Sequence, residues 1–152
     1  MNLLTTPDLS HGLLELFNPA GLYDPSANGY SHVAVVRLPA RVIHIAGQGG
    51  EDADGHLSPG FGEQVEQALD NLQIALRSAQ ASLADVARLR ILVVDHDEDR
   101  LGIIARQVRR RWPNGAAPTC TLIPVPRLAL DGMLFEIEAE AVSYTHLRAH
   151  ET

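Results

Sequence analysis

Apolar and polar positions recur with two different periods along this chain, and the changes of period mark the expected elements. From Phe61 to about Gln80 the apolar side chains return every three or four residues, which predicts an amphipathic helix. A second helix is predicted from Asp97 to Trp112, where the same spacing follows acidic residues and precedes three arginines. Pro113 then ends this helix.

Runs rich in β-branched residues predict five strands, at 31–38, 42–48, 89–95, 119–125 and 133–142. The first two flank a Pro-Ala turn and are expected to pair as a hairpin, whereas residues 1–30 carry many turn signals and are expected to be loop-rich. The predicted order is therefore ββαβαββ, an α/β fold. Two helices cannot cover both faces of such a sheet, so we expect self-association to bury the other face.

Composition narrows the class of protein. The 152 residues suit one domain, and the net charge of -7 argues against nucleic acid or an anionic membrane as partner. All twelve basic residues are arginine, which excludes a lysine Schiff base and a lysine-containing phosphate loop. No run is long and apolar enough to span a membrane, and no signal peptide is recognisable, so a cytoplasmic location is expected.

The last ten residues, 143–152, do not continue the pattern of the strand before them. They read as the in-frame translation of a transposase sequencing adapter, so we expect a tail that is not native. The expected organisation is an N-terminal extension at 1–17, one domain at 18–142 and this tail.

Several motifs suggest metal or nucleotide chemistry, but none fits it. The acidic stretches 52–54 and 95–99 lack the glycine and glutamate that a calcium loop requires. His32 and His44 are expected to be offset on neighbouring strands without a carboxylate partner, which disfavours a metal site. The glycine-rich run 47–50 lacks the third spaced glycine of a dinucleotide fold, and is better explained by close approach of the backbone. We therefore expect neither a metal nor a cofactor.

Two other features carry candidate chemistry. Cys120 lies within a strand, where a buried thiol usually behaves as a small apolar group, although a nucleophilic role stays open. Glu136, Glu138 and Glu140 alternate with apolar residues and share one sheet face. Glu138 and Glu140 suit a solvated face, whereas Glu136 lies nearest a turn and is the best candidate for a pocket.

The motifs GYSHVAVV, IHIAGQGG, EQVEQALDNLQIAL, ILVVD, PTCTLIPVPRLA and FEIEAEA, taken in this order, resemble the RidA/YjgF (Rid) family. The resemblance extends from Asn18 to Ala141. It implies a chorismate-mutase-like mixed sheet with two helices on one face. It also implies a homotrimer with ligand clefts between subunits, and hydrolytic deamination of small reactive imines and enamines.

The resemblance also implies site residues. Tyr30 and Glu136 match the catalytic tyrosine and the glutamate that orders water, and Gly47 and Gln48 match the substrate-binding turn. The family arginine that clamps a substrate carboxylate is replaced by Cys120, next to Thr119. Loss of a buried bidentate arginine–carboxylate contact costs about 2–5 kcal/mol, so a less acidic substrate is expected.

Three functions remain open. The first is a Rid-type hydrolase of a small imine or enamine, in which Glu136 positions water. The second is a non-catalytic trimer that binds a small molecule or has a regulatory role. The third makes Cys120 a reactive thiol.

Overall fold

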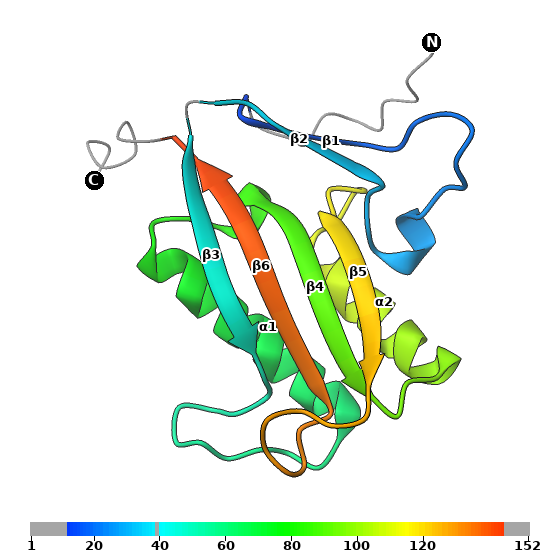
Figure 1. Ribbon diagram of the computed structural model, residues 1–152, viewed down its shortest axis with the longest axis vertical. Helices are drawn as coiled ribbons and strands as arrows, with labels where there is room; N and C mark the ends of the chain where they lie inside the picture. Colours follow the sequence, from blue (N-terminus) through cyan, green and yellow to red (C-terminus); the bar gives the residue numbers. More distant parts are fainter. Residues whose placement is uncertain (1–11, 39, 145–152) are drawn as a thin grey trace.

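The computed structural model describes residues 12–38 and 40–144, and Figure 1 shows their arrangement. The elements in chain order are β1 (Leu14–Phe17), η1 (Ser26–Asn28), β2 (Val33–Val36), β3 (Arg41–Gln48), α1 (Phe61–Ser78), η2 (Leu83–Asp85), β4 (Val86–Val94), α2 (Glu98–Arg111), β5 (Thr119–Val125) and β6 (Phe135–Ser143). None of the helices in this part of the chain is long and apolar enough to cross a membrane.

The main sheet has the strand order β3-β6-β4-β5. Strand β6 pairs antiparallel with both β3 and β4, whereas β5 runs parallel to β4. Both α1 and α2 lie behind one face of this sheet, and the opposite face carries neither (Figure 1). The predicted mixed sheet with two helices on one face is therefore confirmed.

Alternation along β6 explains which face the helices cover. Phe135, Ile137 and Ala139 are buried among the residues of the main core, and the three glutamates between and after them point to the other side. The helices contribute the matching apolar faces. Buried residues of α1 in this core are Phe61, Val65, Ala68, Leu69, Leu72 and Leu76, and those of α2 are Ile104 and Val108. We call the uncovered side of the sheet the open face.

The second helix begins and ends as its sequence predicts. Asp97 caps it, because its carboxylate accepts a hydrogen bond of 2.8 Å from the backbone nitrogen of Arg100. At the other end Arg111 reaches across to α1 and pairs with Asp70 at 2.7 Å. The pair of Arg111 and Asp70 therefore holds the end of α2 alongside α1.

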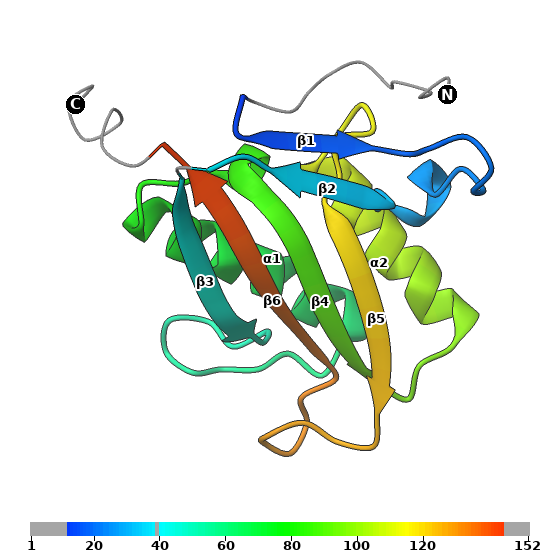
Figure 2. The ribbon, with the colours of Figure 1, turned by 45° about the horizontal axis from the view of Figure 1, so that its top comes forward.

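The predicted hairpin of the first two strands is wrong. Strand β2 pairs antiparallel with β1, which lies in the segment expected to be loop, and β3 pairs with β6. Figure 2 shows the β1–β2 ribbon crossing one end of the main sheet. Leu14 of this ribbon packs with Ala87 and Val142, so the ribbon buries that end of the open face. The sequence pattern identified β2 as a strand but could not identify its partner.

The end of β6 coincides with the start of the predicted tail. Ser143 is buried and pairs with Arg41 of β3, whose Nε donates a hydrogen bond of 3.1 Å to the Ser143 hydroxyl. Residues 145–152 of the predicted adapter-derived tail lie outside the described residues.

Candidate functional site

The predicted site residues fall into two groups within the described chain. Glu136 and Gly47 meet on the open face, near the end of β3. Tyr30 and Cys120 line a cavity on the side of the sheet that carries the helices. Glu136 pairs with Leu92 of β4, and Cys120 pairs three residues earlier with Leu89. From strand spacing and rise, the Cα atoms of Glu136 and Cys120 are on the order of 14 Å apart.

An irregularity in β3 brings Gly47 beside Glu136. Ile45 pairs with Ala139 and Gln48 with Ile137, so three steps along β3 match two along β6. Because of the extra residue, the residues that follow point to the opposite sheet face from the one that regular alternation would give. Gly47 therefore faces Glu136. A Cβ built on Gly47 would lie 2.1 Å from Glu136 Oε1 and 2.6 Å from its Cδ. Glycine at position 47 therefore makes the space that the Glu136 carboxylate occupies.

The loop after β3 is fixed to α1. Asn71 Nδ2 donates hydrogen bonds to the carbonyls of Gly49 at 3.0 Å and Glu51 at 2.7 Å. Between them Gly50 lies against α1, where an added Cβ would be 2.7 Å from the Cα of Gln64. The backbone of the predicted glycine-rich turn is thus held by the helix behind it.

A buried glutamine of α1 fixes the segment that leads into Glu136. Gln64 is fully buried, and its Nε2 donates to the carbonyls of Ser58 at 2.8 Å and Gly132 at 2.9 Å. Its Oε1 accepts a hydrogen bond of 2.9 Å from the backbone nitrogen of Leu134. Gln64 was not among the residues predicted from the sequence, although a polar residue in the apolar stripe of a helix is a signal that could have found it.

Partial burial sets the chemistry of Glu136. Burial raises the pKa of its carboxyl above the ordinary value, and the negative charges of Glu138 and Glu51 raise it further. A carboxyl with a raised pKa can hold a proton closer to neutral pH than an exposed one, which suits transfer of a proton in either direction. The surroundings of Glu136 thus allow its carboxyl to exchange a proton.

The cavity that contains Tyr30 and Cys120 has a volume of about 380 Å³. Its walls come from the segment before β2, from α2, and from β4 and β5. They are formed by Tyr23, Asn28, Gly29, Tyr30, Ile91, Leu101, Ile104, Val108, Cys120, Thr121 and Leu122. No charged side chain of the described residues is among them. The cavity therefore suits an uncharged, largely apolar group.

Cys120 is an uncharged part of this wall. Burial raises the pKa of its thiol to about 12, so the thiol stays protonated at neutral pH. A protonated thiol is a poor nucleophile. The structure thus gives no support to the hypothesis that Cys120 is a reactive thiol.

The Tyr30 hydroxyl is held by a second tyrosine that the sequence pattern did not single out. Tyr23 and Tyr30 share a hydrogen bond between their hydroxyls, and their rings meet edge to face. His32 packs edge to face on both rings, and its Nε2 lies 2.7 Å from the carbonyl oxygen of Tyr23. His32 is therefore a partnered polar group in an aromatic cluster, as its lack of a metal motif suggested.

Two predicted binding residues have local partners. The Gln48 amide donates a hydrogen bond of 3.0 Å to the carbonyl of Ala46. The Thr119 hydroxyl donates a hydrogen bond of 2.8 Å to the carbonyl of Ala87. Gln48 lies at the end of β3, beyond Gly47, whereas Thr119 begins β5, next to Cys120 but outside its cavity wall.

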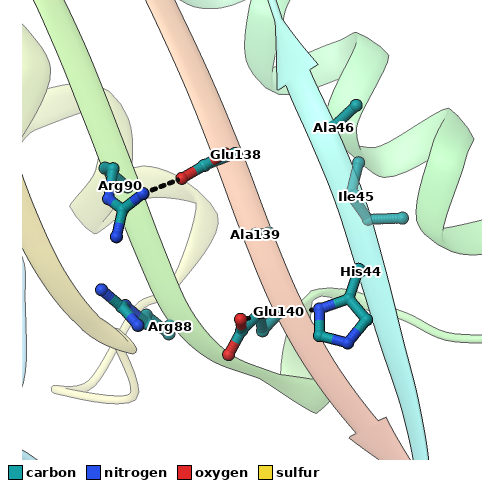
Figure 3. A pocket seen from close by; sticks show the side chains of 8 residues that line it. All are labelled: His44, Ile45, Ala46, Arg88, Arg90, Glu138, Ala139 and Glu140. Carbon is teal, nitrogen blue, oxygen red and sulfur yellow. Dashed lines mark ion pairs between the residues drawn. The ribbon is translucent and has the colours of Figure 1, made fainter.

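The middle of the open face carries a hollow of about 460 Å³ lined by charged side chains, which Figure 3 shows. Arg90 pairs with Glu138 at 2.8 Å, and His44 lies 3.5 Å from Glu140. The expectation that His44 lacks a carboxylate partner is therefore wrong, because β3 pairs with β6 and brings Glu140 beside it. Glu138 and Glu140 are half-exposed, as predicted for a solvated face.

The acidic stretch 52–54 forms an exposed turn. The Asp52 carboxylate accepts hydrogen bonds of 2.9 Å from the backbone nitrogens of Asp54 and His56, which lowers the pKa of Asp52. Candidate metal-ligand atoms of Asp52, Asp54 and His56 lie within 4.8 Å of one another. The hydrogen bonds of the turn account for this grouping.

Known proteins resemble this chain in both sequence and fold. A family model described as "Endoribonuclease L-PSP" matches residues 23–143. The Rid-family protein YyfB from Yersinia pestis, of unknown function, is 36% identical over 86% of this chain and 99% of its own, with a TM-score of 0.82. Rv2704 from Mycobacterium tuberculosis, of the YjgF/YER057c/UK114 family, is 29% identical over 86% of this chain and 99% of its own, with a TM-score of 0.59.

A more distant likeness extends to RidA from an Antarctic Psychrobacter, which is 23% identical over 74% of this chain and 89% of its own. Its TM-score of 0.60 shows a shared fold. No curated protein matches the chain significantly.

Proposed function

This chain belongs to the Rid (YjgF/UK114) family, and on that premise we propose that it is a hydrolase of small reactive imines or enamines. The observation that carries the proposal is the Glu136 carboxyl, which lies over Gly47 and has a raised pKa. Glu136 matches the family glutamate that orders water, and its surroundings suit a group that must both take and return a proton.

The proposed reaction adds water across a C=N bond. The Glu136 carboxylate takes a proton from water as the water oxygen bonds to the carbon of a protonated imine, and the C=N π electrons move to nitrogen. The resulting carbinolamine receives the proton back on nitrogen. The C–N bond then breaks with its electron pair leaving on ammonia, while the hydroxyl passes its proton to the Glu136 carboxylate as the carbonyl forms. Glu136 gives this proton to the ammonia and is a carboxylate again. The products are a ketone or aldehyde and ammonium.

We propose a homotrimer in which neighbouring subunits form the cleft together. The two groups of site residues are too far apart in one subunit to contact one small substrate. A neighbour that supplies the Tyr30–Cys120 cavity next to Glu136 would join them. The uncovered sheet favours such an assembly, because Val42, on the open face, and Ile123, on the edge strand, are 49% and 40% exposed.

A second candidate function is binding without catalysis, as a small-ligand or regulatory trimer. It is favoured by Cys120, because a protonated thiol cannot replace the family arginine as a clamp for a carboxylate. The cavity around it would then hold an uncharged metabolite.

The test is hydrolysis of freshly generated imines by the purified protein, followed as release of the carbonyl product. Replacement of Glu136 by Gln removes the proton acceptor and keeps the shape, so the rate should fall about 100-fold or more. Glu140→Gln is the matched control, because Glu140 lies on the same strand and face but pairs with His44. Ligand-induced thermal stabilisation without turnover would instead support the binding trimer.

A further inference from the structure

Glu51 places a second carboxylate beside the proposed catalytic glutamate. Its side chain lies over Gly49, where an added Cβ would be 2.5 Å from Glu51 Oε2. Glu136 lies in the same way over Gly47. Two residues along an extended chain span about 7 Å, so the two carboxylates flank one short glycine segment.

No arginine of the described residues pairs with the carboxylate of Glu51 or of Glu136. Within the part of the chain that the structure describes, neither Glu51 nor Glu136 has an ion-pair or hydrogen-bond partner for its carboxylate. On the neighbouring strand β4, Arg90 is paired with Glu138. Both glutamates are partly buried, so water only partly screens their mutual repulsion.

Two strands and one loop surround Glu136. Glu138 is the next residue on the same face of β6 and is paired with Arg90, whereas β4 presents Leu92 opposite Glu136. On the β3 side the neighbours are Gly47 and then Glu51. Burial raises the pKa of Glu136 most, and the charges of Glu138 and then Glu51 raise it further. Of these two charges, Glu138 is paired with Arg90, so Glu51 is the one without a cation partner among the described residues.

We propose that Glu51 is a specificity-determining residue that acts through Glu136, so that the pair selects a substrate with a cationic nitrogen and no carboxylate. A protonated imine of an alkyl or aryl aldehyde or ketone has these properties. Two nearby negative charges favour the binding of such a substrate and repel the carboxylate of a 2-imino acid. That carboxylate also lacks the family arginine, because the neutral thiol of Cys120 takes its place. This inference rests on the proposed function in taking Glu136 as the reacting centre.

The first experiment follows the titration of Glu136 itself. Carbon-13 NMR of the side-chain carboxyls, assigned with Glu136→Gln, gives its midpoint in the wild type, in Glu51→Gln and in Glu140→Gln. Glu51→Gln removes a like charge and should move the midpoint to lower pH, whereas Glu140→Gln should leave it in place. An unchanged midpoint in Glu51→Gln would show that the two carboxylates are not coupled and would overturn the inference.

The second experiment measures charge selection without catalysis. Calorimetry or NMR titration compares binding of benzylammonium with that of benzoate, two probes of similar shape and opposite charge. The wild type should bind benzylammonium at least about tenfold more tightly, and Glu51→Gln should reduce this ratio about three- to tenfold. The Glu140→Gln variant should keep the wild-type ratio. Equal binding of both probes, or a ratio insensitive to Glu51→Gln, refutes the selection.

These outcomes separate the two proposals. Hydrolysis of imines without preference between cationic and carboxylate-bearing substrates would keep the proposed function and reject the role of Glu51. Selective binding of benzylammonium without hydrolysis of any imine would keep the charge selection and reject the hydrolase.

Discussion

Replacement of Gly47 by alanine tests whether the position of Glu136 determines activity. The added Cβ would lie 2.1 Å from Glu136 Oε1 and 2.8 Å from its Cγ. An ordinary contact needs about 3.4 Å or more, so the Glu136 carboxyl must move by roughly 1 Å or more. Gly47 is not among the described residues with positive φ, so the backbone itself accepts alanine without strain.

The expected loss is large in activity and small in stability. A displacement of about 1 Å at a reacting group lowers the rate by about 100-fold. Overpacking costs about 1–3 kcal/mol and is offset in part by the reduced entropy of the unfolded chain, a gain of about 0.4–1 kcal/mol. Imine hydrolysis, measured as kcat/KM, and urea unfolding of the same preparation would record both quantities.

A second glycine supplies the control. Gly62 lies in α1, and a Cβ there would be 3.9 Å from its nearest neighbour, Ile103 Cγ2. Gly62→Ala should keep full activity and stabilise the protein by about 0.5–1 kcal/mol through helix propensity. Full activity in a folded Gly47→Ala protein would refute the view that this glycine makes room for a working Glu136.

Three further predictions concern buried groups. Because burial raises the pKa of Cys120 to about 12, the native thiol should resist iodoacetamide at neutral pH and react once urea unfolds the chain; rapid native labelling would contradict its burial. Gln64→Leu should lower the free energy of unfolding by about 2–4 kcal/mol, because it leaves backbone groups in two loops unpaired, and Gln73→Leu should change it by less than about 1 kcal/mol. The raised pKa of Glu136 means that folding disfavours its ionised form, so wild-type stability falls as pH rises through that pKa. Glu136→Gln should therefore be more stable than wild type at pH 7.5 but not below the ordinary value of 4.5, and an equal difference in urea unfolding at both pH values would argue against a raised pKa.

Local periodicity was sufficient to predict the elements that depend on one buried face. The helix predicted from Phe61 to about Gln80 is α1, and the strand predicted at 119–125 is β5 with the same bounds. Strand pairing was harder to predict, because local periodicity identifies a strand but not the segment whose backbone pairs with it. The strand β2 was expected to form a hairpin with β3, but it pairs with β1.

The site was predictable only in part, because polar residues reveal their roles through contacts distant in sequence. Glu136 could be singled out from its place near a turn. Asn71 and Gln64, which hold the loops around it, gain their importance from partners about 20 to 70 residues away. The role proposed for Glu51 likewise depends on the irregularity in β3 that places Gly47 beside Glu136.

The division of the site between two sides of one sheet has a genetic consequence. If the cleft joins Glu136 of one subunit to Tyr30 of its neighbour, a subunit defective in one residue can be rescued by a subunit defective in the other. Mixed oligomers of Glu136→Gln and Tyr30→Phe chains would then contain some junctions with both native side chains. Co-expressed mutant alleles should complement each other, although each allele alone is inactive.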